Sequence, residues 1–130
     1  MPHFERSAIV ERDPSEAFRY LSDVRRLPEY VATMVEAERA DAGRLHVAAD
    51  VDGRHESGDA YFRADSQSQR LEWSGREGSG YSGWLQIDAS GPGGSEVTIH
   101  LQTIGRHDVR AIEQALQDTL SNIQTRLTER

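Results

Sequence analysis

The 130-residue sequence contains no cysteine, and this absence removes several chemistries at once. Without thiols the chain forms no disulfide framework, no cysteine nucleophile and no thiolate metal site, and such a composition fits a cytoplasmic protein. Lysine is also absent, and 22 acidic side chains outnumber 15 basic ones, which gives a net charge of −7. Because phosphate backbones are bound by clustered basic side chains, nucleic acid is not an expected partner.

Long apolar runs are missing as well. No stretch of 18 apolar residues occurs, and the segment from Met1 to Phe4 lacks the basic and apolar regions of a secretion signal. We therefore expect neither a membrane span nor export by a standard signal. A chain of this length buries roughly two-thirds of its unfolded surface. The sequence predicts one domain over residues 1–130, with a core that needs no metal or disulfide.

The most regular pattern present lies at the end of the chain, from about His107 to Arg130. Apolar residues recur there at intervals of three and four, which places them on one stripe of an α-helix with polar residues on the other side. A helix with one apolar face buries that face against another element, and a sheet is the expected one. The stripe consists of Val109, Ile112, Leu116, Leu120, Ile123 and Leu127.

The first 30 residues predict a strand followed by two short helices. Residues 4–12 alternate as a strand does. The sequence Asp-Pro-Ser-Glu at 13–16 has an N-cap residue, a proline at the first helical position and a glutamate at the third. Asp23 is expected to cap a second short turn, and Pro28 is expected to end that turn because the residue before a proline avoids the helical region.

From Val31 onward the period changes from helical to alternating, which predicts six strands separated by turn residues. One face of these strands is apolar and the other polar, as in an antiparallel sheet covered on one side. A twisted sheet of this size curls, so we expect a cavity beneath a single helix that crosses its concave face. The breaks between strands lie at 41–43, 52–53, 66–69, 77–80 and 91–94.

Short motifs in a fixed order carry a family resemblance. They are the Asp-Pro-Ser-Glu-Ala-Phe helix start at 13–18, Tyr-Leu-Ser-Asp at 20–23, Leu-Pro at 27–28 with Tyr30, the glycine-containing strand at 81–83 and Glu-Val-Thr at 96–98. Together with the order of elements, these motifs resemble the START-type lipid-transfer and polyketide cyclase/dehydrase superfamily, often called SRPBCC. The resemblance implies an α+β helix-grip fold: a curved antiparallel sheet of about seven strands, two short helices and a long C-terminal helix across the concave face.

Candidate ligand-binding residues are those expected to face the cavity. Phe62, Trp73, Tyr81 and Tyr30 would supply an aromatic wall, for which plain core packing is the alternative. Two further residues, Ile112 and Leu116, would contribute from the long helix, and the segments 27–32 and 77–80 are expected to form the mouth of the cavity.

Arg6 and Tyr81 are the candidate polar anchors, and Arg6 is the sharper of the two because alternation places it on the apolar face of the first strand. A guanidinium there would pair with a carboxylate or phenolate of a ligand. We favour the alternative that Arg6 reaches water or pairs with Glu56, since arginine is seldom fully buried.

Other features point away from cofactors. The five histidines show no metal-ligand spacing, and neither a P-loop nor a dinucleotide fingerprint occurs, so no metal and no cofactor are expected. Alternation places Trp84 on the opposite face of its strand from its apolar neighbours, which makes it either an exposed aromatic residue or the sign of a bulge near Gly83.

Three functions are compatible with these features, because one superfamily hosts many activities. We place first a binding or carrier protein that encloses a small hydrophobic, apolar or aromatic molecule between sheet and helix. The second is an enzyme of the polyketide cyclase/dehydratase type, in which a tyrosine, arginine or carboxylate aids enolisation. The third is a co-chaperone-like interaction module, which would show a large exposed apolar patch.

Overall fold

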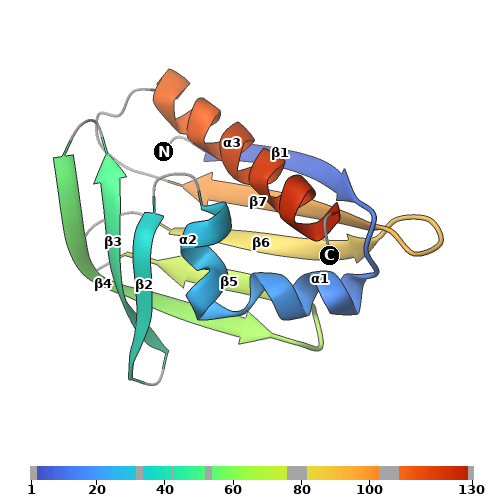
Figure 1. Ribbon diagram of the computed structural model, residues 1–130, viewed down its shortest axis with the longest axis horizontal. Helices are drawn as coiled ribbons and strands as arrows, with labels where there is room; N and C mark the ends of the chain where they lie inside the picture. The colour runs from blue at the N-terminus through green and yellow to red at the C-terminus, as the bar shows by residue number, and fades with distance from the viewer. Residues whose placement is uncertain are drawn as a thin grey trace.

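The structure, a computed structural model, shows seven strands and a set of helices (Figure 1). The residues that it describes are 3–31, 34–41, 43–51, 54–75, 82–102 and 109–128. The elements are, in chain order, β1 (His3–Val10), α1 (Pro14–Leu21), the 3₁₀ helix η1 (Val24–Arg26), α2 (Leu27–Tyr30), β2 (Met34–Asp41), β3 (Arg44–Val51), β4 (Arg54–Asp65), β5 (Arg70–Ser74), β6 (Ser82–Ala89), β7 (Ser95–Gln102) and α3 (Val109–Thr128).

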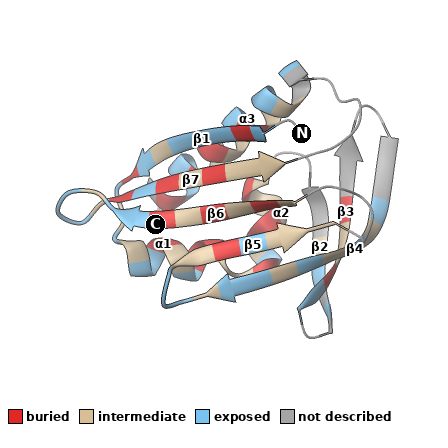
Figure 2. Cartoon of the chain, turned by 180° about the vertical axis from the view of Figure 1, so that it is seen from behind, coloured by how far each residue is buried: buried red, intermediate tan, exposed pale blue. Residues whose placement is uncertain are grey.

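All seven strands form one antiparallel sheet in the order β1-β7-β6-β5-β4-β3-β2. Strands β2 to β7 follow one another as a meander, and β1 joins the sheet by pairing with the last strand, β7. Helices α1, α2 and α3 lie on one face of this sheet, and a view from behind shows the strands in front of the helices (Figures 1 and 2). The predicted α+β helix-grip fold is confirmed.

The start of α1 forms as its sequence predicts. Asp13 is the N-cap residue, and its Oδ1 accepts a hydrogen bond from the backbone N–H of Glu16 at 3.0 Å. Pro14 occupies the first turn, where its missing N–H removes no helical hydrogen bond. This cap fixes where the chain turns from β1 onto the sheet's face.

Replacing the cap residue should cost a measurable part of the stability. Asp13→Ala is expected to lower the free energy of unfolding by about 1 kcal/mol, because the N–H of Glu16 loses its acceptor. Asp13→Asn keeps an acceptor oxygen and should retain most of the lost stability. Urea unfolding followed by circular dichroism measures both changes. Equal losses in the two variants would contradict the cap as the cause.

The predicted stop at Pro28 is wrong. Asp23 does cap η1, since its Oδ1 accepts the N–H of Arg25 at 3.1 Å. However, Leu27–Tyr30 then forms the further helix α2, with Pro28 in its first turn. Proline is tolerated there because the first turn of a helix does not use that N–H. Between residues 14 and 30 the chain therefore forms three short helical segments instead of two.

The turns between strands can be compared with prediction at three of five places. The breaks at 41–43, 66–69 and 91–94 each separate two strands, as expected. Gly91 and Gly93 have φ angles of 66° and 72°, in the left-handed region that glycine adopts without strain. The expected turns at 52–53 and 77–80 lie outside the described residues.

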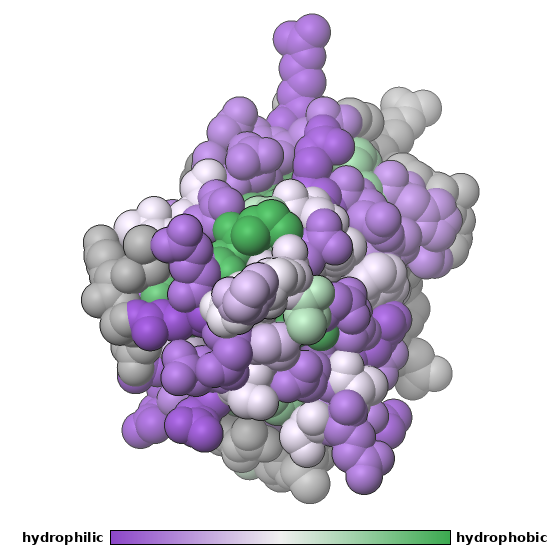
Figure 3. All heavy atoms as spheres, turned by 90° about the vertical axis from the view of Figure 1, so that its right-hand side faces the viewer, coloured by the Kyte–Doolittle hydropathy of each residue, from purple (hydrophilic) through white to green (hydrophobic). Residues whose placement is uncertain are grey.

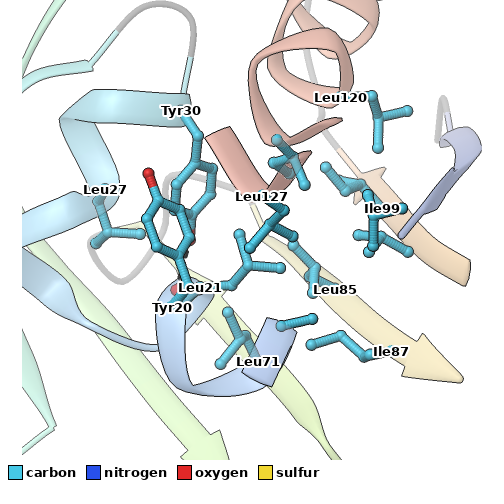
Figure 4. Close-up of a cluster of buried hydrophobic side chains, with 14 of the residues drawn as sticks. Tyr20, Leu21, Leu27, Tyr30, Leu71, Leu85, Ile87, Ile99, Leu120 and Leu127 are labelled. Atoms are coloured by element: carbon cyan, nitrogen blue, oxygen red, sulfur yellow. Dashed lines mark hydrogen bonds between the residues drawn. The ribbon is translucent and has the colours of Figure 1, made fainter. Parts of the chain in front are cut away.

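The hydrophobic core lies between the sheet and the helices, and Figure 4 shows its closely packed part. At most positions, alternation predicts correctly which strand residues face the core. Ala48 is an exception, because alternation places it on the opposite face from Leu45 and yet it is buried. It pairs with Glu36 where the β2–β3 register shifts, and its side chain is small enough for neighbours to cover. Within the described residues, no helix is long and apolar enough to cross a membrane. The largest fully buried apolar side chains are Leu21, Leu71, Leu85, Ile87, Leu120, Ile123, Leu127, Val10 and Val97.

Candidate functional site

Five side-chain positions form a row across the helix-covered face, one from each of five neighbouring strands. Strand pairing places Phe62 opposite Trp73, and Trp73 opposite Gly83. It continues from Gly83 to Leu101, and from Leu101 to Phe4. We call these five residues the Trp73 row. Residues directly opposite in a sheet stand side by side on one face, so the row is a continuous layer.

Gly83 leaves room in this row for the Trp73 ring. A β-carbon on Gly83 would lie 2.7 Å from two atoms of the indole and 2.7 Å from the carbonyl oxygen of His100. The indole therefore rests against the glycine backbone. A bulge, one of the two alternatives for Trp84, is absent from this stretch of described residues, because β6 pairs in regular register with both neighbours. Trp84 therefore alternates onto the outer face.

The apolar stripe of α3 is closed at one end and partly open at the other. Leu120 and Ile123 are 1% and 0% exposed, whereas Ile112, two turns nearer the start of the helix, is only partly buried. Phe62, Trp73 and Leu101 are likewise partly buried while packing against the core. The core therefore includes partly covered apolar side chains on β4, β5 and β7 and in the first turn of α3.

The closed end is held by hydrogen bonds that join α3 to β1 and to Arg12, which follows that strand. Arg12 Nε donates to the carbonyl oxygen of Leu127 at 2.7 Å, and Gln124 Nε2 donates to that of Ile9 at 3.0 Å. Figure 3 faces the end of the molecule that carries α1 and shows a mainly hydrophilic surface with a small hydrophobic patch. These contacts fix the last turns of α3 over the sheet.

Arg6 lies at the rim of the partly open end. Its guanidinium forms an ion pair with Glu113 of α3 at 3.6 Å, and the two side chains are 48% and 47% exposed. Arg6 therefore reaches solvent, as we favoured, while the side chain of its expected partner Glu56 lies outside those described. A pair this exposed contributes at most about 1 kcal/mol, so the guanidinium remains available to an anionic group.

Tyr30 is placed apart from the Trp73 row. It is 2% exposed, and its hydroxyl donates to the carbonyl oxygen of Leu21 at 2.6 Å, next to Tyr20 (Figure 4). Burial raises the pKa of Tyr30 far above its usual value. Asn122 of α3 donates to its backbone oxygen at 3.2 Å. In this structure Tyr30 joins α1, α2 and α3, and its role toward a ligand stays a prediction.

The remaining predicted site residues also do not all lie at the Trp73 row. Leu116 is buried in the core at 3% exposure, next to the partly open end. Tyr81 lies outside the described residues, as does the predicted cavity mouth at 77–80. The other predicted mouth, the segment 27–32, is largely taken up by α2 with its buried Leu27. Of the predicted set, the structure brings together Phe62 and Trp73 from the sheet.

Two hollows that the sequence did not predict are lined mainly by residues of the outer face of the sheet. The larger, of about 590 Å³, has Tyr61, Trp84 and His100 among its lining residues, and Phe62, Trp73 and Gly83 of the Trp73 row also border it. The smaller, of about 360 Å³, is lined by Arg44, Asp59 and neighbours, with Tyr61 shared between the two. The Trp84 ring stacks on His100 with centroids 5.1 Å apart. The alternation along each strand could have indicated this cluster, because it places Tyr61, Trp84 and His100 on the outer face of the sheet.

The described part of the Trp73 row offers apolar surface and no acid or base. The pKa shifts resolved among the described residues belong to groups elsewhere. A hydrogen bond from Arg25 lowers the pKa of Asp23, and burial together with Glu29 raises that of Tyr20. This arrangement suits the burial of an apolar ligand more than proton transfer.

Comparison with solved structures shows the same fold in proteins of low sequence identity. The di-domain aromatase/cyclase BexL from the BE-7585A biosynthetic pathway has a TM-score of 0.79 at 15% identity, over 96% of this chain and 46% of that one. Zhui aromatase/cyclase from Streptomyces sp. R1128 has a TM-score of 0.81 at 12% identity, over 97% and 93%. A START superfamily protein from Mycobacterium smegmatis has 0.77 at 11%, over 98% and 97%.

The chain spans about half the length of BexL, which has two such domains. No curated protein sequence matches this one. A family model does match, over residues 1–128, and it describes polyketide cyclases/dehydrases and lipid-transport proteins. The chain belongs to this polyketide cyclase/dehydrase and lipid-transport family, as the motifs of its first 30 residues predicted.

Proposed function

We propose that this protein binds and carries a small apolar or aromatic molecule at the partly open end of its core. The observation that carries the proposal is the incomplete cover of Phe62, Trp73, Leu101 and Ile112, which all pack against the core. Partly exposed apolar side chains gain free energy when a ligand removes them from water, at about 25 cal/mol per Å² of apolar surface. Family membership supports the same class of ligand.

The shape of the Trp73 row favours a flat ligand. The Trp73 indole rests on Gly83, and Phe62 stands beside it on the next strand. Aromatic rings add about 0.5–1.5 kcal/mol to a contact beyond the area that they bury. At the rim, Arg6 could exchange its exposed partner Glu113 for a carboxylate or phenolate of the ligand. The ligand would then be apolar over most of its length with one acidic end.

An enzyme of the cyclase/dehydratase type is the second candidate, because Zhui and BexL are named as aromatase/cyclases. Such a reaction needs several polar groups that converge on the bound chain. Among the described residues of the Trp73 row all side chains are apolar, and the nearest ion pair, Arg6 with Glu113, is half exposed. We therefore rank the carrier above the enzyme.

Removing the Trp73 ring should weaken ligand binding selectively. Trp73→Ala is expected to reduce the affinity for the fluorescent dye 1-anilinonaphthalene-8-sulfonate at least about tenfold, because a buried aromatic contact of this size is worth more than 1 kcal/mol. Trp84→Ala removes the same side chain from the opposite face of the neighbouring strand and should leave dye affinity within about twofold. Fluorescence titration of the folded variants measures both.

Native mass spectrometry of the purified protein extends this test to the natural ligand. We expect a stoichiometric apolar passenger that denaturing extraction releases and that Trp73→Ala loses. Equal dye affinity in the wild type and both tryptophan variants would contradict the proposed site. A mass spectrum without a passenger, combined with no dye binding, would shift the assignment to an interaction module.

A further inference from the structure

Two histidine rings meet on the outer face of the sheet, away from the Trp73 row. His3 Nδ1 and His100 Nε2 are 3.2 Å apart, although the residues are 97 positions apart in sequence. The β1–β7 register produces this contact, because Glu5 pairs with His100 and places His3 on the diagonal. His3 is exposed, and the His100 side chain is 21% exposed. Both rings therefore have access to ions in solution.

Glu5 determines which nitrogen of His100 carries a hydrogen. Its Oε1 lies 3.2 Å from His100 Nδ1. A carboxylate only accepts, so Nδ1 donates to Glu5 and the lone pair of Nε2 points toward His3. Histidines that ligate metals commonly donate their other ring N–H to a carboxylate in this way. The neutral tautomer that binds a metal is thus already selected for His100.

Neighbouring strands hold the His100 ring in place. Trp84 stacks on it with an angle of 7° between the ring planes, and the Arg70 guanidinium lies 4.3 Å from the centroid of the Trp84 ring. A ring fixed on one side by stacking and on another by a carboxylate loses little further freedom when it binds an ion. Among the described residues, the charged groups near the pair include Glu5, which favours a cation, Glu72 and Arg63, which line the same hollow as His100, and the more distant Arg70.

We propose that His3 and His100 form a binding site for a divalent transition-metal ion of the class that imidazole ligates, such as Zn²⁺ or Ni²⁺. Two nitrogens that each lie about 2.0–2.1 Å from a tetrahedral ion are about 3.3 Å apart, close to the separation of the two rings. The ion replaces the hydrogen shared between the rings. His3 then carries its hydrogen on Nε2, so both lone pairs point at the metal.

The site supplies two ligands from the protein. Among the described residues, no three histidine, cysteine or acidic side chains converge to hold a metal. Water, or an added small ligand in the adjoining hollow that His100 and Trp84 line, completes the coordination. The bound ion is therefore exchangeable and weaker than in four-ligand structural sites. The net charge of −7 raises the local concentration of cations.

Calorimetric titration with Zn²⁺ alone at pH 7.5 tests the proposal on the full chain. We expect one ion per chain, with H3Q and H100Q each weakening binding at least about tenfold, which is about 1.4 kcal/mol. H46Q is the matched control, because His46 is also an outer-face histidine beside a carboxylate, Asp59, at 3.5 Å.

A second measurement locates the ion without relying on affinity. Ni²⁺ bound between the rings should quench Trp84 fluorescence, because the indole stacks on His100. The quenching should disappear in W84F, whose remaining tryptophan is Trp73 on the other face. Wild-type protein that binds no Zn²⁺, an unchanged affinity in either H3Q or H100Q, or an equal loss in H46Q would each overturn the site. Matching thermal unfolding curves establish that the variants are folded.

Discussion

Gly83→Ala is expected to lower the free energy of unfolding by about 3 kcal/mol, the upper part of the range for overpacked cores. The added β-carbon would meet the Trp73 indole at 2.7 Å and the backbone oxygen of His100 at 2.7 Å. The ring can rotate away, but the carbonyl belongs to the paired strand β7 and moves only with the sheet. The loss therefore combines a displaced aromatic ring with a strained strand pairing.

Gly58→Ala is the matched control, since Gly58 also lies within a strand of the same sheet and its added β-carbon would meet nothing within 4 Å. That change should leave stability within about 1 kcal/mol and can even raise it, because alanine restricts the unfolded chain. Urea unfolding of both variants gives the comparison. Equal effects at the two glycines would show that the contact between Gly83 and Trp73 is not what requires glycine there.

The same substitution links stability to the proposed site. Displacing the indole from Gly83 alters the surface that Trp73 presents beside Phe62. Dye affinity should therefore fall in Gly83→Ala under conditions where the protein remains folded, and should not change in Gly58→Ala. A folded Gly83→Ala protein with unchanged dye affinity would separate the packing of this row from ligand binding.

The elements that the sequence predicted well are those defined by local periodicity. The stripe ending in Ile123 and Leu127 marks α3, and alternation assigns Trp84 to the outer face once the β6 register is regular. Such patterns act within a few residues, so one strand or helix suffices to specify them. Pro28 was misjudged because the same residue is compatible with a helix start and with a helix end.

Contacts between distant segments were not predictable in the same way. Arg6 pairs with Glu113, a partner that the sequence did not identify, because the position of α3 along β1 decides which carboxylate comes within reach. His3 and His100 meet through the register of β1 on β7, which spacing rules for metal ligands within one segment do not detect. Sequence patterns give the face of each residue, whereas register and helix placement decide its partners.

The candidate site depends on one such placement. Strand β7 ends at Gln102 and α3 begins at Val109, and Leu101 and Ile112, close to these two ends, pack against the core while only partly buried. Parity correctly placed these apolar residues on the helix side. How far each side chain is covered depends on how all the surrounding elements pack together, and no short sequence pattern contains that information.

Two alanine substitutions on one helix should separate structural from ligand-facing positions. Leu120→Ala is expected to lower the free energy of unfolding by about 3–4 kcal/mol, because a fully buried leucine leaves a cavity. Ile112→Ala should cost only about 1 kcal/mol, since its side chain is partly exposed already. Urea unfolding with both arms of the transition resolved measures this difference.

Ligand binding should follow the opposite order. Ile112→Ala is expected to weaken dye binding several-fold with little loss of stability, whereas Leu120→Ala at a temperature where it stays folded should bind the dye nearly as the wild type does. The reason is that Leu120 packs within the closed end, while Ile112 borders the half-covered row. A loss of stability in Ile112→Ala as large as in Leu120→Ala would mean that the stripe is closed along its length. In that case the core would offer a ligand no uncovered surface at the start of α3, and the carrier proposal would fail.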